Sequence, residues 1–140
     1  TRMVQTHGQY WETKRLQDRI EQLGYSVAYT KDLRMGSAWM SIPVYGTTRK
    51  NVGKLSIEVE EGLSWDSRYA VLAHEGGHIF QSERYSEAEG EAFAEAVAML
   101  VAGDGIREHA RYLATHKLAL FTVLMLDSAK VYRAAAVLQE

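Results

Sequence analysis

The residues best suited to chemistry in this sequence form the pattern His-Glu-x-x-His, at His74, Glu75 and His78. Residues four positions apart lie on one face of a helix, so both imidazoles can bind the same metal ion. Glu75 then projects beside the ion, where it can take a proton from a metal-activated water and pass it to a leaving amine. The pattern is typical of hydrolytic zinc sites, although histidine and carboxylate ligands also bind other divalent ions.

A catalytic zinc ion usually has three protein ligands, so this site needs one more. The sequence has no cysteine, which leaves histidines and carboxylates. If the next helix returns antiparallel to the first, Glu91 lies level with His78, and we expect it to be the third ligand. Glu95, one turn further along, lies level with His74 and is expected to accept the second N–H of that imidazole. Glu87 is the alternative third ligand.

Two glycines inside the motif indicate close packing. Gly76 and Gly77 each cost a helix on the order of 1 kcal/mol relative to alanine. That cost predicts the close approach of another element or of a ligand.

The first half of the chain must supply a helix and a small sheet. Apolar residues recur at helical spacing over residues 9–23, and β-rich stretches follow at residues 25–30 and 38–45. Lys54–Glu60 is the clearest strand because apolar and polar residues alternate along it. The polar segment 47–53 is interpreted as a turn.

The second half is predicted to be helical. Ser64 or Asp66 can cap a helix that runs to about residue 81, and Ser86 with Glu89 forms a capping box for a helix that reaches about residue 102. Helices over 106–126 and 128–138 follow, separated near Asp127. This order predicts an α+β domain spanning residues 1–140, in which a small, mostly antiparallel sheet precedes a metal-binding helix and further helices.

Composition narrows the classes of function. The chain has 140 residues and a net charge of −2, so it lacks the basic surplus typical of proteins that bind nucleic acid or anionic membranes. No apolar run is long enough to span a membrane, and the lack of cysteine is compatible with the cytoplasm, where we expect the protein. The chain does not begin with Met, which is compatible with a piece of a longer protein. Nucleic-acid binding is therefore expected only of flanking regions.

The motif and its surroundings resemble a known family. Residues 68–78, RYAVLAHEGGH, are similar to the active-site helix of the ArdC-type zincin metallopeptidases, found in plasmid antirestriction and phage polyvalent proteins. Residues 90–95, GEAFAE, resemble that family's second helix with its first Glu replaced by Gly, and HARYLA at 109–114 and YRAAA at 132–136 resemble its later motifs. The resemblance implies a zincin-like fold and a gluzincin-like zinc site of His74, His78 and Glu91.

A second resemblance points to another third ligand. Residues 87–94, EAEGEAFA, are similar to the E-x-E-A-N-x-F-A pattern of the ImmA/IrrE metallopeptidases. That match would make Glu87 the ligand in place of Glu91. Both families imply the same fold class and the same metal chemistry.

The resemblance also implies where a substrate lies. Zincins commonly bind their substrate along an edge strand beside the metal helix, and Lys54–Glu60 is expected to be that strand, with a peptide pairing along Leu55, Ser56, Ile57 and Glu58. The alternative is an ordinary edge strand protected by its charges. Amide hydrolysis also needs a donor for the oxyanion, and His109 and Tyr112 are candidates on one helix face.

Two functions are compatible with these features. The first is a zinc-dependent metallopeptidase that acts on a peptide or protein. The second is a zincin-fold antirestriction or DNA- or protein-binding module with little or no proteolysis. The sequence gives no indication of the oligomeric state.

Overall fold

The structure is a computed structural model, and it describes residues 2–36, 41–51, 54–103 and 117–140. This part of the chain is α+β, as expected. Its elements, in chain order, are α1 (Arg2–Gln22), β1 (Ser26–Thr30), β2 (Arg34–Gly36), β3 (Ser41–Pro43), β4 (Gly46–Asn51), β5 (Lys54–Glu60), α2 (Trp65–His78), α3 (Glu87–Ala102) and α5 (Lys117–Gln139). None of the helices in these ranges is both long and apolar enough to cross a membrane.

The main sheet has the strand order β1-β5-β4. Strand β5 runs parallel to β1 and antiparallel to β4, so the sheet is mixed and the prediction of a mostly antiparallel sheet holds only in part. Because β5 has a neighbour on each side, it is the central strand, and its residues Ile57 and Val59 are completely buried. Strands β2 and β3 pair separately and antiparallel.

The segment predicted as a turn forms strand β4 instead. Its residues pair with β5 from Gly46, opposite Val59, to Asn51, opposite Lys54. Its polar composition misled the prediction, because polar and charged residues are also typical of strands at the edge of a sheet. The β-branched residues Thr47 and Thr48 suit the extended backbone.

The helices follow the predicted caps and breaks closely. Helix α3 begins with the predicted capping box, in which the Ser86 hydroxyl accepts the backbone N–H of Glu89 and the Glu89 carboxylate accepts that of Ser86. Ser64 caps α2, and α5 has a non-helical residue at Asp127, where the two final helices were expected to separate. Helix α1 begins earlier than predicted, at Arg2.

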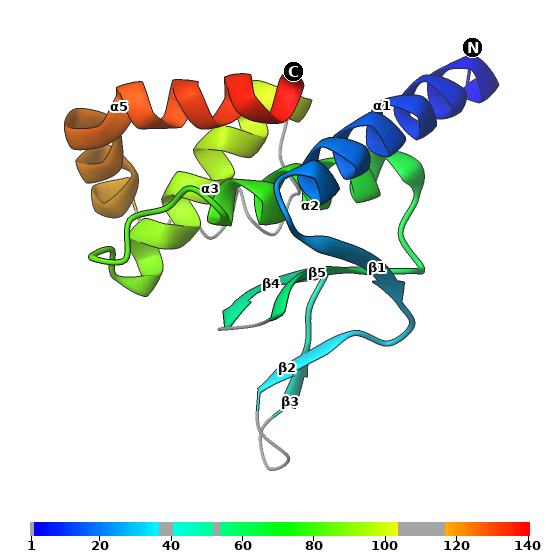
Figure 1. Cartoon of the computed structure of the whole chain (residues 1–140), viewed down its shortest axis with the longest axis horizontal. Coiled ribbons are helices and arrows are strands. Elements are labelled where there is room, and N and C mark those ends of the chain that lie inside the picture. Colours follow the sequence, from blue (N-terminus) through cyan, green and yellow to red (C-terminus); the bar gives the residue numbers. More distant parts are fainter. Residues whose placement is uncertain (1, 37–40, 52–53, 104–116) are drawn as a thin grey trace.

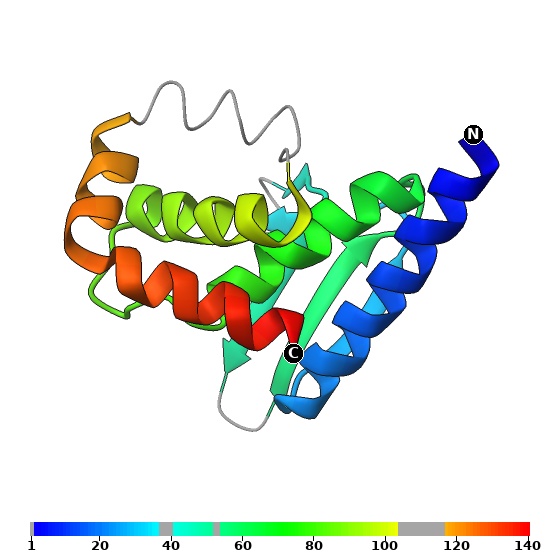
Figure 2. The same cartoon turned by 90° about the horizontal axis from the view of Figure 1, so that it is seen from above.

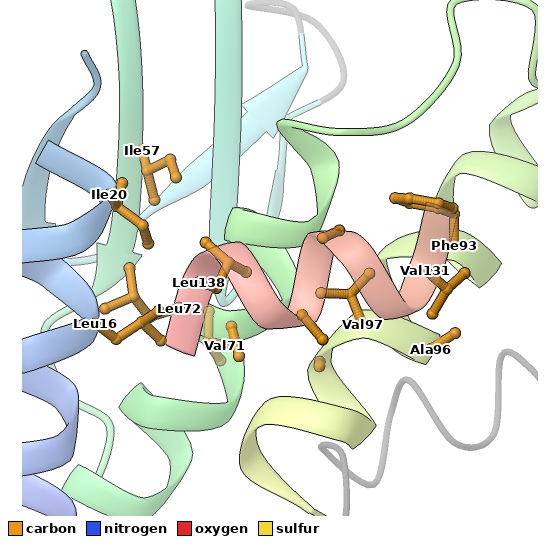
Figure 3. Close-up of a cluster of buried hydrophobic side chains, with 14 of the residues drawn as sticks. Leu16, Ile20, Ile57, Val71, Leu72, Phe93, Ala96, Val97, Val131 and Leu138 are labelled. Carbon is orange, nitrogen blue, oxygen red and sulfur yellow. The ribbon is translucent and has the colours of Figure 1, made fainter. Parts of the chain in front are cut away.

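The helices lie on one side of the main sheet, and β2 and β3 extend beyond its other side (Figure 1). Helix α2 is the central helix, and its residues 70–77 are all buried. Side chains from α1, β5, α2, α3 and α5 meet in one core, among them Ile20, Ile57, Leu72, Phe93 and Leu138 (Figure 3). The end of α5 lies beside α1, where Arg19 Nε donates to the carbonyl oxygen of Val137 at 2.8 Å (Figure 2). The core thus fixes α2 between the sheet and α3.

Candidate metal centre

Helices α2 and α3 pack antiparallel and very close together. The Tyr69 hydroxyl, near the start of α2, donates to the carbonyl oxygen of Val101, near the end of α3, at 3.3 Å. At the other end of α2, a Cβ atom on Gly77 would lie only 2.9 Å from both the Cα and the carbonyl oxygen of Ala94. Glycine at position 77 therefore permits an approach of the two backbones that no other residue would allow, as the two glycines of the motif predicted.

This packing brings His74, His78 and Glu91 together. The Nε2 atom of His74 lies 3.0 Å from Oε2 of Glu91 and 3.2 Å from Nε2 of His78, which lies 3.3 Å from Oε1 of Glu91. Three atoms bound to one tetrahedral zinc ion would lie about 3.3 Å apart, given the usual bond lengths of roughly 2.0–2.1 Å. The three side chains are therefore spaced to hold one metal ion.

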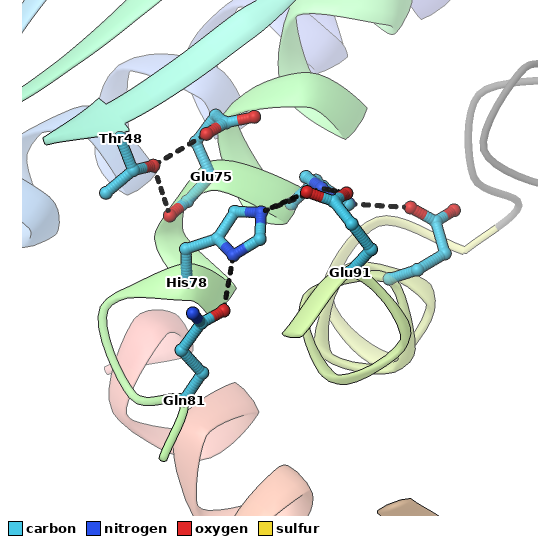
Figure 4. A network of polar contacts seen from close by, with 7 residues as sticks. Thr48, Glu75, His78, Gln81 and Glu91 are labelled. Carbon is cyan, nitrogen blue, oxygen red and sulfur yellow. Dashed lines mark hydrogen bonds and ion pairs between the residues drawn. The ribbon is translucent and has the colours of Figure 1, made fainter. Parts of the chain in front are cut away.

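The second nitrogen of each imidazole faces an oxygen that accepts a hydrogen bond. Nδ1 of His74 lies 2.8 Å from Oε2 of Glu95, with both side chains 2% exposed, and Nδ1 of His78 lies 2.6 Å from Oε1 of Gln81 (Figure 4). Each Nδ1 is therefore placed to donate a hydrogen bond, and the two Nε2 atoms face Glu91 and each other, as two ligands of one ion would.

The electrostatics of the cluster also favour positive charge. Burial by itself would lower the pKa of His74, but the hydrogen bonds with Glu91 and Glu95 outweigh this effect and raise the pKa to about 10. Burial would raise the pKa of Glu91, yet the hydrogen bonds with His74 and His78 hold that pKa below its usual range. The carboxylates thus stabilise a positive charge at His74.

Strand β4 holds Glu75 beside this cluster. The Thr48 hydroxyl lies 2.6 Å from Oε1 of Glu75 and 3.0 Å from the Glu75 carbonyl oxygen (Figure 4). A Cβ atom on Gly46 would lie 2.8 Å from Cγ of Glu75 and 2.7 Å from Cγ1 of Val71, so the strand can approach α2 only because residue 46 is glycine. Glu75 is 5% exposed, and its carboxylate is fixed in place by the strand.

A cavity of about 330 Å³ opens onto the cluster. Its lining includes Thr48 from β4, Glu75 and His78 from α2, and Glu91 from α3. Two of the three candidate ligands, His78 and Glu91, therefore face one open space together with the candidate base Glu75.

Several predicted site residues lie elsewhere. Glu87 is exposed in the first turn of α3, and Glu91 rather than Glu87 belongs to the cluster. The assignment of Leu55, Ser56, Ile57 and Glu58 to an edge strand is wrong, because β5 is paired on both sides and has no free edge for a peptide. His109 and Tyr112 lie outside the described residues.

Two residues of the site were not anticipated. Thr48 was missed because its segment was interpreted as a turn. Gln81 follows His78 by three residues, a spacing that brings side chains together at the end of a helix and was the available signal.

The chain matches no protein-family model, no curated protein and no solved structure. Its function is therefore argued from the geometry of this centre.

Proposed function

We propose that the protein is a zinc-dependent metallopeptidase with a zincin-like fold and a gluzincin-like site of His74, His78 and Glu91. The observation that carries the proposal is the convergence of three ligand atoms, all within 4.8 Å of one another, beside the buried Glu75, which lines the same cavity as His78 and Glu91. A structural zinc site would not need Glu75, which is not among the grouped ligands and is held separately by Thr48.

A zinc ion in this site would lower the pKa of a water molecule to near neutrality and polarise the substrate carbonyl. Glu75 would be the base that accepts a proton from that water and delivers it to the leaving nitrogen. The Thr48 hydroxyl donates a hydrogen bond to Oε1 of Glu75, which leaves Oε2 of Glu75 to receive the proton from the water. Glu95 holds the His74 ring through Nδ1 and so keeps its Nε2 turned toward Glu91 and His78, where an ion would bind.

A peptide substrate is proposed to bind along β4 in place of the predicted β5. In the ranges that the structure describes, β4 pairs with β5 along one edge and with no strand along the other. A peptide can add to such an edge as a further strand. Because Thr48 and Glu75 are hydrogen-bonded, a peptide on this edge would pass close to the proposed base.

The test combines metal content with hydrolysis. Elemental mass spectrometry should find about one zinc per chain in the wild type and in Glu75→Gln. Hydrolysis of a denatured, fluorescently quenched protein should fall by roughly 10²–10⁴-fold in Glu75→Gln. Glu87→Gln, an exposed glutamate of α3, is the matched control and should keep the wild-type rate.

The other outcomes separate the two functions considered from the sequence. Equal hydrolysis by wild type and Glu75→Gln would contradict the role of Glu75. Stoichiometric zinc with no hydrolysis by the wild type would favour the antirestriction or binding module. A chain that takes up no zinc would refute the metal centre itself.

A further inference from the structure

The turn after α2 returns a side chain to the metal centre. Helix α2 ends at His78, and tight backbone hydrogen bonds follow, from the N–H of Ile79 to Gly76 at 3.2 Å and from the N–H of Phe80 to Gly77 at 3.1 Å. The next residue, Gln81, points back so that its Oε1 lies 2.6 Å from Nδ1 of His78 (Figure 4). The chain reversal thus places a neutral hydrogen-bond acceptor behind one proposed ligand.

The carboxamide of Gln81 occupies space left by a glycine of α3. A Cβ atom on Gly90 would lie 2.9 Å from Oε1 of Gln81, 3.1 Å from its Nε2 and 3.2 Å from its Cδ. All three atoms of the amide group therefore rest against Gly90. Glycine is a weak helix former, and neither a turn nor a positive φ requires it at this helical position. Room for Gln81 accounts for its presence.

We propose that Gln81 is a positioning residue for His78. Gly90 has no side chain and so leaves the room that the Gln81 carboxamide needs to reach Nδ1 of His78. By accepting a hydrogen bond from the Nδ1–H group, Gln81 fixes the tautomer and the orientation of the ring, so that Nε2 would direct its lone pair at a bound ion. The proposal rests on the zinc site of the proposed function and is independent of whether hydrolysis occurs.

The two histidines are held in different ways. His74 is 2% exposed and bonded to the equally buried carboxylate of Glu95. His78 is 15% exposed, and its partner is the uncharged amide of Gln81, in the turn that leads into α3. Because His78 is the more exposed ring, its orientation depends more on the hydrogen bond at Nδ1 than that of His74 does.

Zinc affinity tests the role of Gln81 directly. Competition with a chromophoric chelator should show zinc bound roughly 10–100-fold more weakly by Gln81→Ala than by the wild type. Gln81→Glu restores an acceptor of the same length and should bind zinc at least as tightly as the wild type. Gln22→Ala, on the exposed surface of α1, is the matched control and should have no effect.

Gly90→Ala tests the space. The added Cβ displaces only the flexible end of Gln81, so the fold should survive, and the melting temperature of the metal-free protein should stay level or rise by on the order of 3 °C. Gly90→Ala should nevertheless bind zinc more weakly than the wild type, and its loss of affinity should not exceed that of Gln81→Ala. In the double variant Gln81→Ala, Gly90→Ala, affinity should equal that of Gln81→Ala alone, because both changes remove one contact.

Two results would overturn the proposal while leaving the zinc site intact. The first is a zinc affinity of Gln81→Ala equal to that of the wild type. The second is a double variant that binds zinc more weakly than Gln81→Ala by the full loss seen in Gly90→Ala alone. A wild-type chain that binds no zinc would overturn both the proposed function and the role of Gln81. Zinc binding without hydrolysis would contradict only the peptidase.

Discussion

Replacing Gly77 by alanine is expected to force α2 and α3 apart. The new Cβ would lie 2.9 Å from two backbone atoms of Ala94 and 3.1 Å from Cβ of Val97, whereas ordinary contacts begin at 3.4 Å. Backbone atoms within a helix cannot move aside singly, so the helices must separate by at least about 0.5 Å, the difference between those distances. Two of the proposed zinc ligands are on α2 and one is on α3, so the site opens with the helices.

Gly76→Ala is the matched control because the same substitution one residue away meets only side-chain ends. Its Cβ would lie 3.2 Å from Cδ1 of Leu138 and 3.3 Å from Cδ1 of Ile20, which can shift by a few tenths of an ångström. Both variants gain about 1 kcal/mol of helix propensity. Overpacking should cost Gly77→Ala about 1–3 kcal/mol and Gly76→Ala much less. Gly77→Ala should therefore be less stable than Gly76→Ala by about 1–3 kcal/mol.

Thermal unfolding of the two metal-free variants measures this difference, which corresponds to roughly 4 °C in melting temperature per kcal/mol. Chelator competition should show at least tenfold weaker zinc binding in Gly77→Ala, because an error of about 0.5 Å exceeds the usual tolerance of roughly 0.2 Å in metal–ligand distances. If the two variants have the same melting temperature and the same zinc affinity, the close packing of α2 on α3 does not position the ligands.

Further predictions concern individual contacts. Glu91→Ala should lose bound zinc and Glu87→Ala should keep it, measured by elemental mass spectrometry, and the reverse result would identify Glu87 as the ligand. Thr48→Val should slow hydrolysis of a quenched protein substrate by about 10–100-fold without changing zinc content, since a hydrogen bond to a charged group is worth about 1.5–3 kcal/mol, and Thr48→Ser should restore the rate. The pKa of His74 is raised to about 10, so in the metal-free protein at pH 8 the ring is positively charged and carries a proton on each nitrogen. Zinc must displace one of these two protons to bind. Calorimetry in buffers of different ionisation enthalpy should detect about one proton released per zinc, and affinity should fall about tenfold for each pH unit below that pKa; an enthalpy independent of the buffer would contradict this.

Local spacing was enough to predict much of the centre. His74 and His78 share a face of α2 because four residues nearly complete a helical turn, and no distant contact is needed for that. The capping box at Ser86 predicted the start of α3. Counting the same number of residues along two antiparallel helices from the turn between them then predicted that Glu91 and Glu95 lie beside the histidines of α2, as they do. The break near Asp127 is likewise a local feature.

Strand order depended on pairing between distant segments, and the sequence pattern did not contain it. The alternation in Lys54–Glu60 identified a strand but not its neighbours, and burial of Ile57 and Val59 suits a central strand as well as an edge. The polar segment Gly46–Asn51 becomes a strand only by pairing with β5. That pairing is what places Thr48 against Glu75.

The sequence by itself determined the candidate ligands His74 and His78 and the candidate base Glu75, because the residue types and their helical spacing are properties of a single segment. The tertiary structure decided which strand borders the site and which side chains hold the ligands. Thr48 and Gly90 acquire their contacts only when elements from separate parts of the chain pack together, Thr48 on α2 and Gly90 on the turn at Gln81. Such contacts depend on the distances between whole elements, which no local pattern of residues specifies.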